Sequence, residues 1–149
     1  MQIIVEETIR APRTITFANA ADVLNWPSMI SAIQSTEILT REPIVAGTRF
    51  RETRKMYGQV SSEEMTFTEF EPPDHFVLSA ESHGTQYRIA HKFADVADGT
   101  KLTLTFQAEP ATLTAQLLTP LAMMFRSSLR RQLTSDLADL KRAIETRER

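Results

Sequence analysis

The sequence predicts an α+β domain in which an antiparallel sheet packs against one long C-terminal helix. Residues 112–149 carry apolar side chains every three or four positions, which is the period of an amphipathic helix. Residues 3–109 instead show short runs of alternating apolar and polar side chains separated by turn residues, which is typical of strands joined by hairpins. Because each strand has one apolar face, we expect the long helix to cover that face of the sheet.

Composition narrows the class of protein. The 149 residues suit a single domain, which we assign to 1–149. The formal net charge of −2 argues against nucleic-acid binding, and the absence of cysteine excludes disulfides, cysteine nucleophiles and thiolate metal sites. No apolar run approaches the ~20 residues that span a bilayer, and the N-terminus lacks the pattern of a secretory signal. We therefore expect a cytoplasmic protein without a membrane span.

The first 33 residues predict one strand and two short helices. The strand covers residues 3–11, and its apolar face comprises Ile3, Val5, Ile9 and Ala11. Glu7 has the same parity, and Pro12 ends the strand because it cannot donate to a ladder. Residues 14–24 and 29–33 have helical patterns, and helices this short must dock on the sheet to be stable.

Six further strands are predicted before the long helix. Their ranges are 34–41, 49–57, 62–71, 76–82, 85–95 and 101–109. Proline and aspartate at 72–74 favour a tight turn, and Asp98-Gly99 favours a two-residue hairpin. Short turns join neighbouring strands in antiparallel pairs, so we expect one sheet of about six to seven strands.

Six short motifs stand in a recognisable order along the chain. They are IRAP at 9–12, WP at 26–27, GTRF at 47–50, TEFEPP at 68–73, DGT at 98–100 and LADLK at 137–141. In this order they resemble the SRPBCC superfamily of START-like, polyketide cyclase/dehydrase-like and pollen-allergen-like proteins. The resemblance implies a helix-grip fold, in which a curved antiparallel sheet wraps around the C-terminal helix and two short helices follow the first strand. It also implies a cavity for a lipid, sterol, polyketide or other apolar molecule, without implying one activity.

Strand parity and the composition of the long helix predict which side chains line that cavity. We expect the ligand-binding residues to be Met29, Phe50, Met56, Phe67, Leu78, Tyr87, His91, Leu104, Met124 and Phe125. Tyr87 and His91 are the polar points of an otherwise apolar wall. Met124 suits a wall that adapts to a ligand because methionine is flexible, and plain core filling is an equal alternative.

Five polar side chains share the inward parity, namely Glu7, Glu52, Arg54, Tyr87 and His91. A Glu52–Arg54 or Glu7–Arg54 pair could hold a ligand's carboxylate or carbonyl, because a buried charge needs a partner. A single bulge would move these side chains to the other face, and for Glu7 and Glu52 we favour this exposed alternative. For Tyr87 and His91, a side chain in the cavity and a side chain at the surface are equal alternatives.

The start of the long helix allows two interpretations. Pro120 either occupies the first turn of the main helix or kinks a longer one. In both cases we expect residues 112–119 to be loosely attached and to act as a gate to the cavity. The predicted apolar face of the whole stretch comprises Leu117, Leu118, Leu121, Phe125, Leu129, Leu133, Leu137, Leu140 and Ile144, and Asp136 is expected on the polar face.

The functional prediction is the binding of a small hydrophobic ligand, of lipid, polyketide or aromatic type, between sheet and helix. The alternative is a polyketide cyclase or dehydratase-type enzyme, in which His91 or Glu7 moves a proton and Tyr87 or Arg54 steadies an enolate oxygen. A module that binds a protein partner is a third reading. No residue is assigned a catalytic role, so the sequence leaves open whether the chain is an enzyme.

No cofactor and no metal site are predicted. The three histidines lack the spacing of metal ligands, and the four glycines lie in turns rather than in a phosphate-binding loop. Arg126, Arg130 and Arg131 form a small basic cluster that we interpret as a solvated helix face. We expect a monomer or a homodimer.

Overall fold

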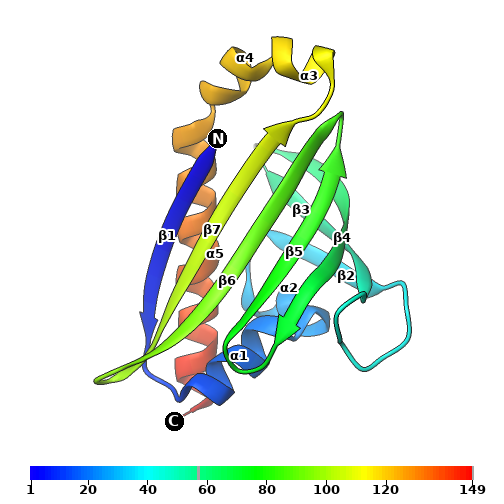
Figure 1. Ribbon diagram of the computed structural model, residues 1–149. Helices are drawn as coiled ribbons and strands as arrows, with labels where there is room; N and C mark the ends of the chain where they lie inside the picture. Colours follow the sequence, from blue (N-terminus) through cyan, green and yellow to red (C-terminus); the bar gives the residue numbers. More distant parts are fainter. Residues whose placement is uncertain (57, 149) are drawn as a thin grey trace.

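The computed structural model describes residues 1–56 and 58–148, which form one sheet and a set of helices (Figure 1). In chain order the elements are β1 (Gln2–Ile9), α1 (Arg13–Ala21), the 3₁₀ helix η1 (Val23–Asn25), α2 (Trp26–Met29), β2 (Ile33–Ile38), β3 (Arg49–Met56), β4 (Gln59–Glu71), β5 (His75–Ser82), β6 (Thr85–Val96), β7 (Gly99–Pro110), α3 (Leu113–Leu117), α4 (Thr119–Met123) and α5 (Arg126–Arg147). Tyr57 and Arg149, the last residues of a predicted strand and of the predicted helix, lie outside the described residues.

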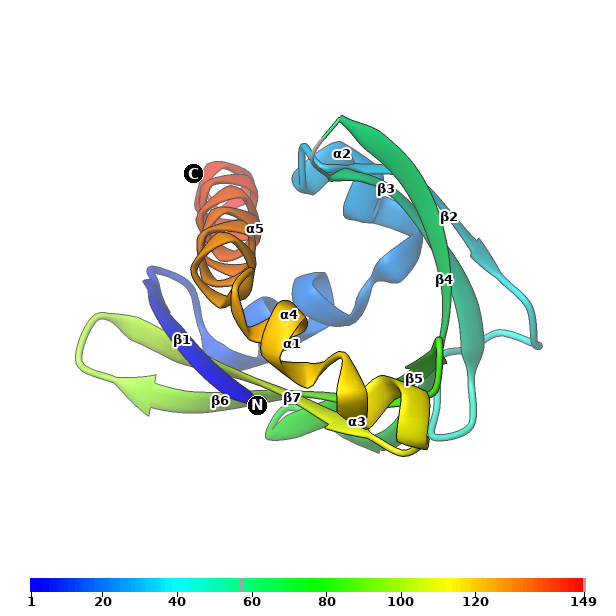
Figure 2. The same cartoon turned by 90° about the horizontal axis from the view of Figure 1, so that it is seen from above.

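The seven strands form one antiparallel sheet with the order β1-β7-β6-β5-β4-β3-β2. Register shifts between Ile33 and Ser35 of β2 and between Phe67 and Glu69 of β4 are bulges or irregularities, and bulges bend a sheet. Seen from above, the sheet is strongly curved and α5 lies on its concave side (Figure 2). The predicted α+β class with a helix-grip fold is therefore confirmed.

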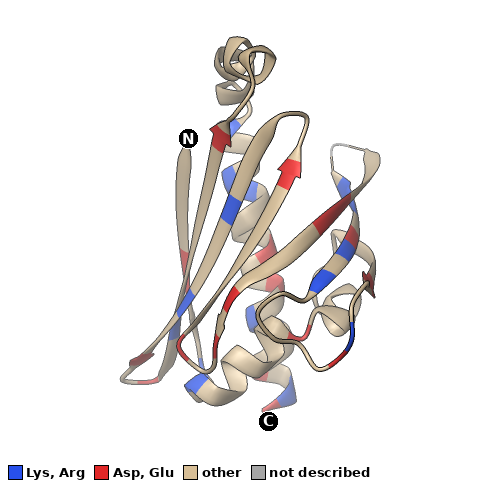
Figure 3. Ribbon diagram, turned by 45° about the vertical axis from the view of Figure 1, so that its right-hand side comes forward, with Lys and Arg blue, Asp and Glu red and all other residues tan. Residues whose placement is uncertain are grey.

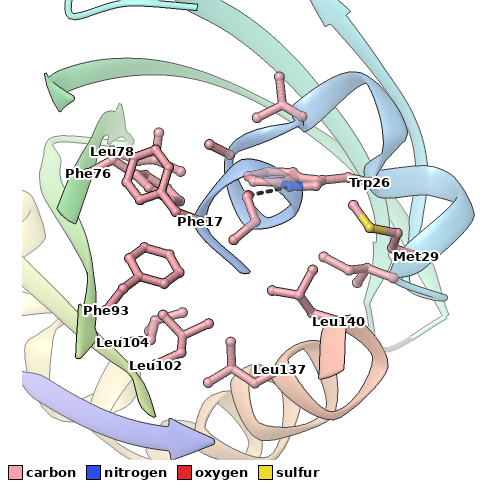
Figure 4. Packing of buried hydrophobic residues seen from close by; sticks show 14 of the residues in the cluster. Phe17, Trp26, Met29, Phe76, Leu78, Phe93, Leu102, Leu104, Leu137 and Leu140 are labelled. Carbon is pink, nitrogen blue, oxygen red and sulfur yellow. Dashed lines mark hydrogen bonds between the residues drawn. The ribbon is translucent and has the colours of Figure 1, made fainter. Parts of the chain in front are cut away.

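The short helices after β1 pack beneath one end of the sheet (Figure 1). Phe17 of α1 meets Phe76 and Phe93 of the sheet in edge-to-face contacts, with ring centroids 5.6 and 5.1 Å away. The indole Nε1 of Trp26 donates a hydrogen bond of 3.0 Å to the Ala20 oxygen (Figure 4). This aromatic cluster closes the lower end of the space between sheet and helix.

Helix α5 packs against the concave face and also covers one edge of the sheet. Its buried apolar side chains are Leu133, Leu137, Leu140 and Ile144. Arg126 and Arg130 donate to the main-chain oxygens of Gln2 and Ile4, at 2.9 and 3.0 Å. Because β1 is an edge strand, these carbonyls have no strand partner on that side. Two members of the predicted solvated basic cluster therefore bind the sheet edge.

The long C-terminal helix is confirmed, but neither interpretation of Pro120 matches the structure, because the helical stretch is interrupted in its first third. The structure has three helices there, with breaks at Leu118 and at Phe125. Pro120 lies in the first turn of α4, where its missing N–H prevents a continuous helix from α3. The part of the predicted apolar face that is more than half exposed comprises Leu117, Leu118, Leu121 and Phe125. The packed stripe begins only at Leu129.

The second short helix also differs from the prediction. It covers Trp26–Met29 rather than 29–33, and β2 already begins at Ile33. Pro27 is compatible with the first turn because that position needs no hydrogen-bonded N–H. The Ile30 nitrogen donates to the Trp26 oxygen at 2.8 Å and ends the helix.

Candidate functional site

A cavity of about 320 Å³ lies between the concave face of the sheet and α5. Strands β3 to β7 supply one wall, α5 supplies the other, and Trp26 contributes from below. Figure 4 shows Leu78, Leu104 and Leu137 pointing toward the same central space from three different elements. Most of the lining side chains are apolar, so the walls favour an apolar occupant.

The cavity is closed at one end and open at the other. Trp26, Ile30 and Ile33 are buried at the closed end. At the other end Ser61 is exposed and Tyr87 is partly exposed, although both line the cavity. Helices α3 and α4 lie at this open end, and residues 110–125 carry no charged side chain (Figures 1 and 3).

The strongest polar feature of the cavity is a buried ion-pair cluster that joins β3 to α5. The guanidinium of Arg54 donates to Glu52 through Nε and to Asp136 through Nη1, the latter at 2.9 Å. Gln132 Nε2 donates to the second oxygen of Asp136 at 3.0 Å. Glu52 is 3% and Asp136 is 8% exposed. The alternation of β3 places both Glu52 and Arg54 on the concave face, and all four side chains line the cavity.

Burial and pairing act against each other in this cluster. Burial raises the pKa of Glu52 and of Asp136, and the neighbouring Arg54 offsets only part of that rise. Burial by itself would lower the pKa of Arg54, but the two carboxylates outweigh burial and the pKa of Arg54 rises. Arg54 is therefore a permanent cation that holds two carboxylates in place.

His91 of β6 is the second polar point. It is 8% exposed and stacks on Phe76, with ring centroids 4.3 Å apart and the planes 14° from parallel. Burial lowers the pKa of His91 to about 4, so the imidazole is neutral at pH 7. Within residues 1–56 and 58–148, its Nδ1 atom has no hydrogen-bond partner. The neutral ring therefore forms part of the cavity wall, and its unpartnered Nδ1 is buried beneath the surface of that wall.

Tyr87 lies on the same strand, nearer the open end. Its ring is 5.7 Å from that of Phe106. Burial raises the pKa of Tyr87, and the nearby carboxylate of Glu63 raises it further. The phenol is therefore a neutral hydroxyl at pH 7 that can donate and accept hydrogen bonds.

The structure brings together half of the predicted lining residues. Those that line the cavity are Met56, Leu78, Tyr87, His91 and Leu104. Phe50 and Phe67 also face inward, but they are fully buried lower down, where Trp26 stacks edge-on against Phe50. Met29 is buried in the core away from the cavity wall. Met124 and Phe125 lie beyond the helix break and are 77% and 55% exposed.

Of the predicted polar residues, too, some line the cavity and others do not. The exposed alternative that we favoured for Glu52 is wrong, because its strand pairs with β4 in unbroken register and keeps its parity. Glu7 does not line the cavity, and its carboxylate is 3.5 Å from Lys141 of α5. A Glu7–Arg54 pair is therefore not formed.

Asp136 and Gln132 are site residues that the sequence did not predict. Asp136 was expected on the polar face of the helix because it is charged. Its spacing of three and four residues from Leu133 and Leu140 nevertheless places it on the packed face. A carboxylate within the apolar stripe was the available signal.

Residues 1–56 and 58–148 contain neither a grouping suited to a metal ion nor a membrane-spanning helix. No group of three or more histidine, aspartate or glutamate side chains in this range is placed to hold a metal ion. Over the same residues, no helix has the length and apolarity needed to cross a membrane.

A family model described as "Polyketide cyclase / dehydrase and lipid transport" matches residues 1–145. Among solved structures, the Zhui aromatase/cyclase from Streptomyces sp. R1128 is 19% identical, with a TM-score of 0.81 over 100% of this chain and 96% of its own. A protein from Thermus thermophilus, TTHA0849, is also 19% identical, with a TM-score of 0.75 over 100% of both chains. Ara h 8.0201 is 16% identical, with a TM-score of 0.73 over 98% of both chains. No curated protein matches the sequence. At these identities the structural similarities show a shared fold.

Proposed function

Since this chain belongs to the polyketide cyclase/dehydrase and lipid-transport family, we propose that it binds a small hydrophobic molecule in the cavity between the sheet and α5. The observation that carries the proposal is the cavity itself, about 320 Å³ in volume and lined mostly by apolar side chains. This volume lies at the lower end of the ~300–1,000 Å³ found for small-molecule sites. The family description and the aromatase/cyclase similarity support the same ligand class.

The arrangement of the walls supports an internal rather than a surface site. Leu78, Leu104 and Leu137 are nearly fully buried around the cavity, so an apolar ligand there would lose most of its contact with water. Removing apolar surface from water contributes roughly 25 cal/mol per Å² before the costs of association. A ligand enters from the end at which Tyr87 is partly exposed.

Titration with the neutral fluorescent probe N-phenylnaphthylamine tests the proposal. We expect saturable binding to the wild-type protein. Ala80 lines the cavity, so Ala80→Trp fills it and should abolish binding. Ser79→Trp adds the same side chain on the neighbouring strand position, which faces away, and should retain binding. Equal binding by both variants, or no saturable binding by the wild type, contradicts the proposal.

A second candidate function is a cyclase or dehydratase-type reaction in the same cavity. The observation that favours it is the presence of fixed polar groups beside an apolar chamber. Arg54 uses two donors on its carboxylate partners and has further N–H groups to steady a developing enolate oxygen. Neutral His91 lines the same chamber and can accept the proton removed from a carbon between two carbonyls and return it to the new alkoxide. Glu7 has no part in this scheme because it lies outside the cavity.

Turnover of a candidate polyketide substrate tests the enzymatic role. We expect His91→Ala to abolish the reaction and Tyr87→Phe to reduce it, with the fold retained. Full activity of both variants would rule out these residues as the catalytic groups. Loss of turnover together with loss of probe binding would point to a damaged cavity rather than to lost chemistry, so both measurements are made on each variant.

A further inference from the structure

We propose that the cavity selects its ligand by charge, accepting apolar molecules whose polar end is a hydroxyl or an ammonium group and rejecting carboxylates. The inference rests on the proposed function and specifies its ligand class. It follows from the count and pairing of the charged groups along the walls, together with the unpartnered histidine beside them.

Acidic side chains outnumber basic ones on the walls of the cavity. Among the described residues that line it, three are acidic and one is a permanent cation: Glu52, Glu63, Asp136 and Arg54. His91 adds no charge at pH 7. The excess of carboxylates repels an anion, and the repulsion is larger inside an apolar cavity than in water because the dielectric screening is weaker.

The guanidinium of Arg54 is already paired within the protein. Its Nε and Nη1 groups already bind the carboxylates of Glu52 and Asp136, and Gln132 holds the free oxygen of Asp136. A ligand carboxylate would therefore approach a guanidinium whose single positive charge already faces two carboxylates. The structure does not favour the expectation that a Glu52–Arg54 pair holds a ligand's carboxylate. A hydroxyl or an ammonium group, by contrast, can donate to the same carboxylates.

His91 is a neutral polar side chain on the wall of the cavity. It is a cavity residue, more than nine-tenths buried, and its Nδ1 has no partner within residues 1–56 and 58–148. The atom is covered, so a ligand pairs with it only after the ring turns toward the cavity. Because a buried polar atom without a partner is costly, that pairing is favourable. A hydroxyl group suits this atom because it can donate to one imidazole tautomer and accept from the other. A carboxylate can only accept.

Three decyl probes with the same chain test the inference by displacement of bound N-phenylnaphthylamine at pH 7. Decanol is neutral, decylamine is cationic and decanoate is anionic at this pH. We expect decanol and decylamine each to bind about tenfold or more tightly than decanoate. Decylamine separates a response to the sign of the charge from a general penalty on burying any ion.

Variants that remove one negative charge from the cavity complete the test. Glu52→Gln should reduce the preference for decanol over decanoate by about tenfold. Asp136→Asn makes the same change from α5 and keeps the test decisive if Glu52→Gln does not fold. The control is Glu64→Gln, which alters the net charge equally at an exposed position outside the cavity and should leave the preference unchanged.

The outcomes distinguish this inference from the function on which it rests. If none of the decyl probes nor the fluorescent probe binds the wild type, the proposed function is wrong. If decanoate binds as tightly as decanol, or if decylamine binds as weakly as decanoate, the cavity binds ligands but does not select against negative charge. A preference that stays the same in both cavity variants also overturns the inference.

Discussion

Acidification should destabilise this protein through His91. The imidazole is buried and neutral, and burial lowers its pKa from the ordinary 6.5 to about 4. As the pH falls below 6.5 the unfolded chain takes up a proton at this residue and the folded chain does not, so stability is lost between pH 6.5 and about 4. The full difference corresponds to about 3 kcal/mol, of which about 2 kcal/mol is lost between pH 7 and pH 5.

The assay is urea unfolding at pH 7 and at pH 5, followed by the fluorescence of Trp26, the single tryptophan, which is buried. The comparison is between the wild type and His91→Gln, which removes the titrating group. We expect the wild type to lose about 2 kcal/mol more than the variant on this change of pH. Other titrating groups, including Glu52 and Asp136, are present in both proteins and cancel in the difference.

His75 provides a control of opposite sign. It is bonded to Asp74 and Glu69, and these contacts raise its pKa. Its stabilising effect is therefore fully present below pH 6.5 and is lost as the pH rises through its folded pKa. His75→Gln should lose more stability on acidification than the wild type does. If wild type and His91→Gln lose the same stability between pH 7 and pH 5, His91 is not buried in its neutral form and the reasoning fails.

Two substitutions test other parts of the structure by equilibrium unfolding. Arg54→Met leaves two buried carboxylates without their cation and should lower the free energy of unfolding by about 3–5 kcal/mol at pH 7. The decrease should be smaller at pH 5, where the carboxyls gain protons, and an equal decrease at both pH values would contradict this. Gly99→Ala should cost about 1–3 kcal/mol, because Gly99 has φ +149° and a Cβ there would lie 2.2 Å from the Ile9 oxygen; a variant as stable as the wild type would contradict the close approach.

The architecture was predictable because most strands present one predominantly apolar face. In β3 the apolar Phe50 and the polar Glu52 and Arg54 share one parity, and the unbroken pairing with β4 keeps that parity along the whole strand. Parity, however, gives the face of a residue and not its depth along the strand. Phe50 and Phe67 face inward as predicted, but both are fully buried, and Trp26 of α2 packs against Phe50.

The helix residues of the site were harder to predict for two physical reasons. The helical period of the sequence continues across Pro120, but the missing N–H of this residue breaks the helix. Met124 and Phe125 are therefore not on the packed face. Asp136 occupies an apolar-face position, and its charge suggested solvent. Its partner Arg54 lies 82 residues away in the chain, so no local pattern could reveal the pair.

The most direct test of the central claim is native mass spectrometry of the protein purified from its own host, alongside Ala80→Trp. The account predicts that the wild type carries a bound small molecule which organic extraction releases as an apolar compound, and that Ala80→Trp carries none. A wild-type protein that shows no bound mass, and that has no saturable site for N-phenylnaphthylamine, would contradict the claim that this cavity binds a hydrophobic ligand.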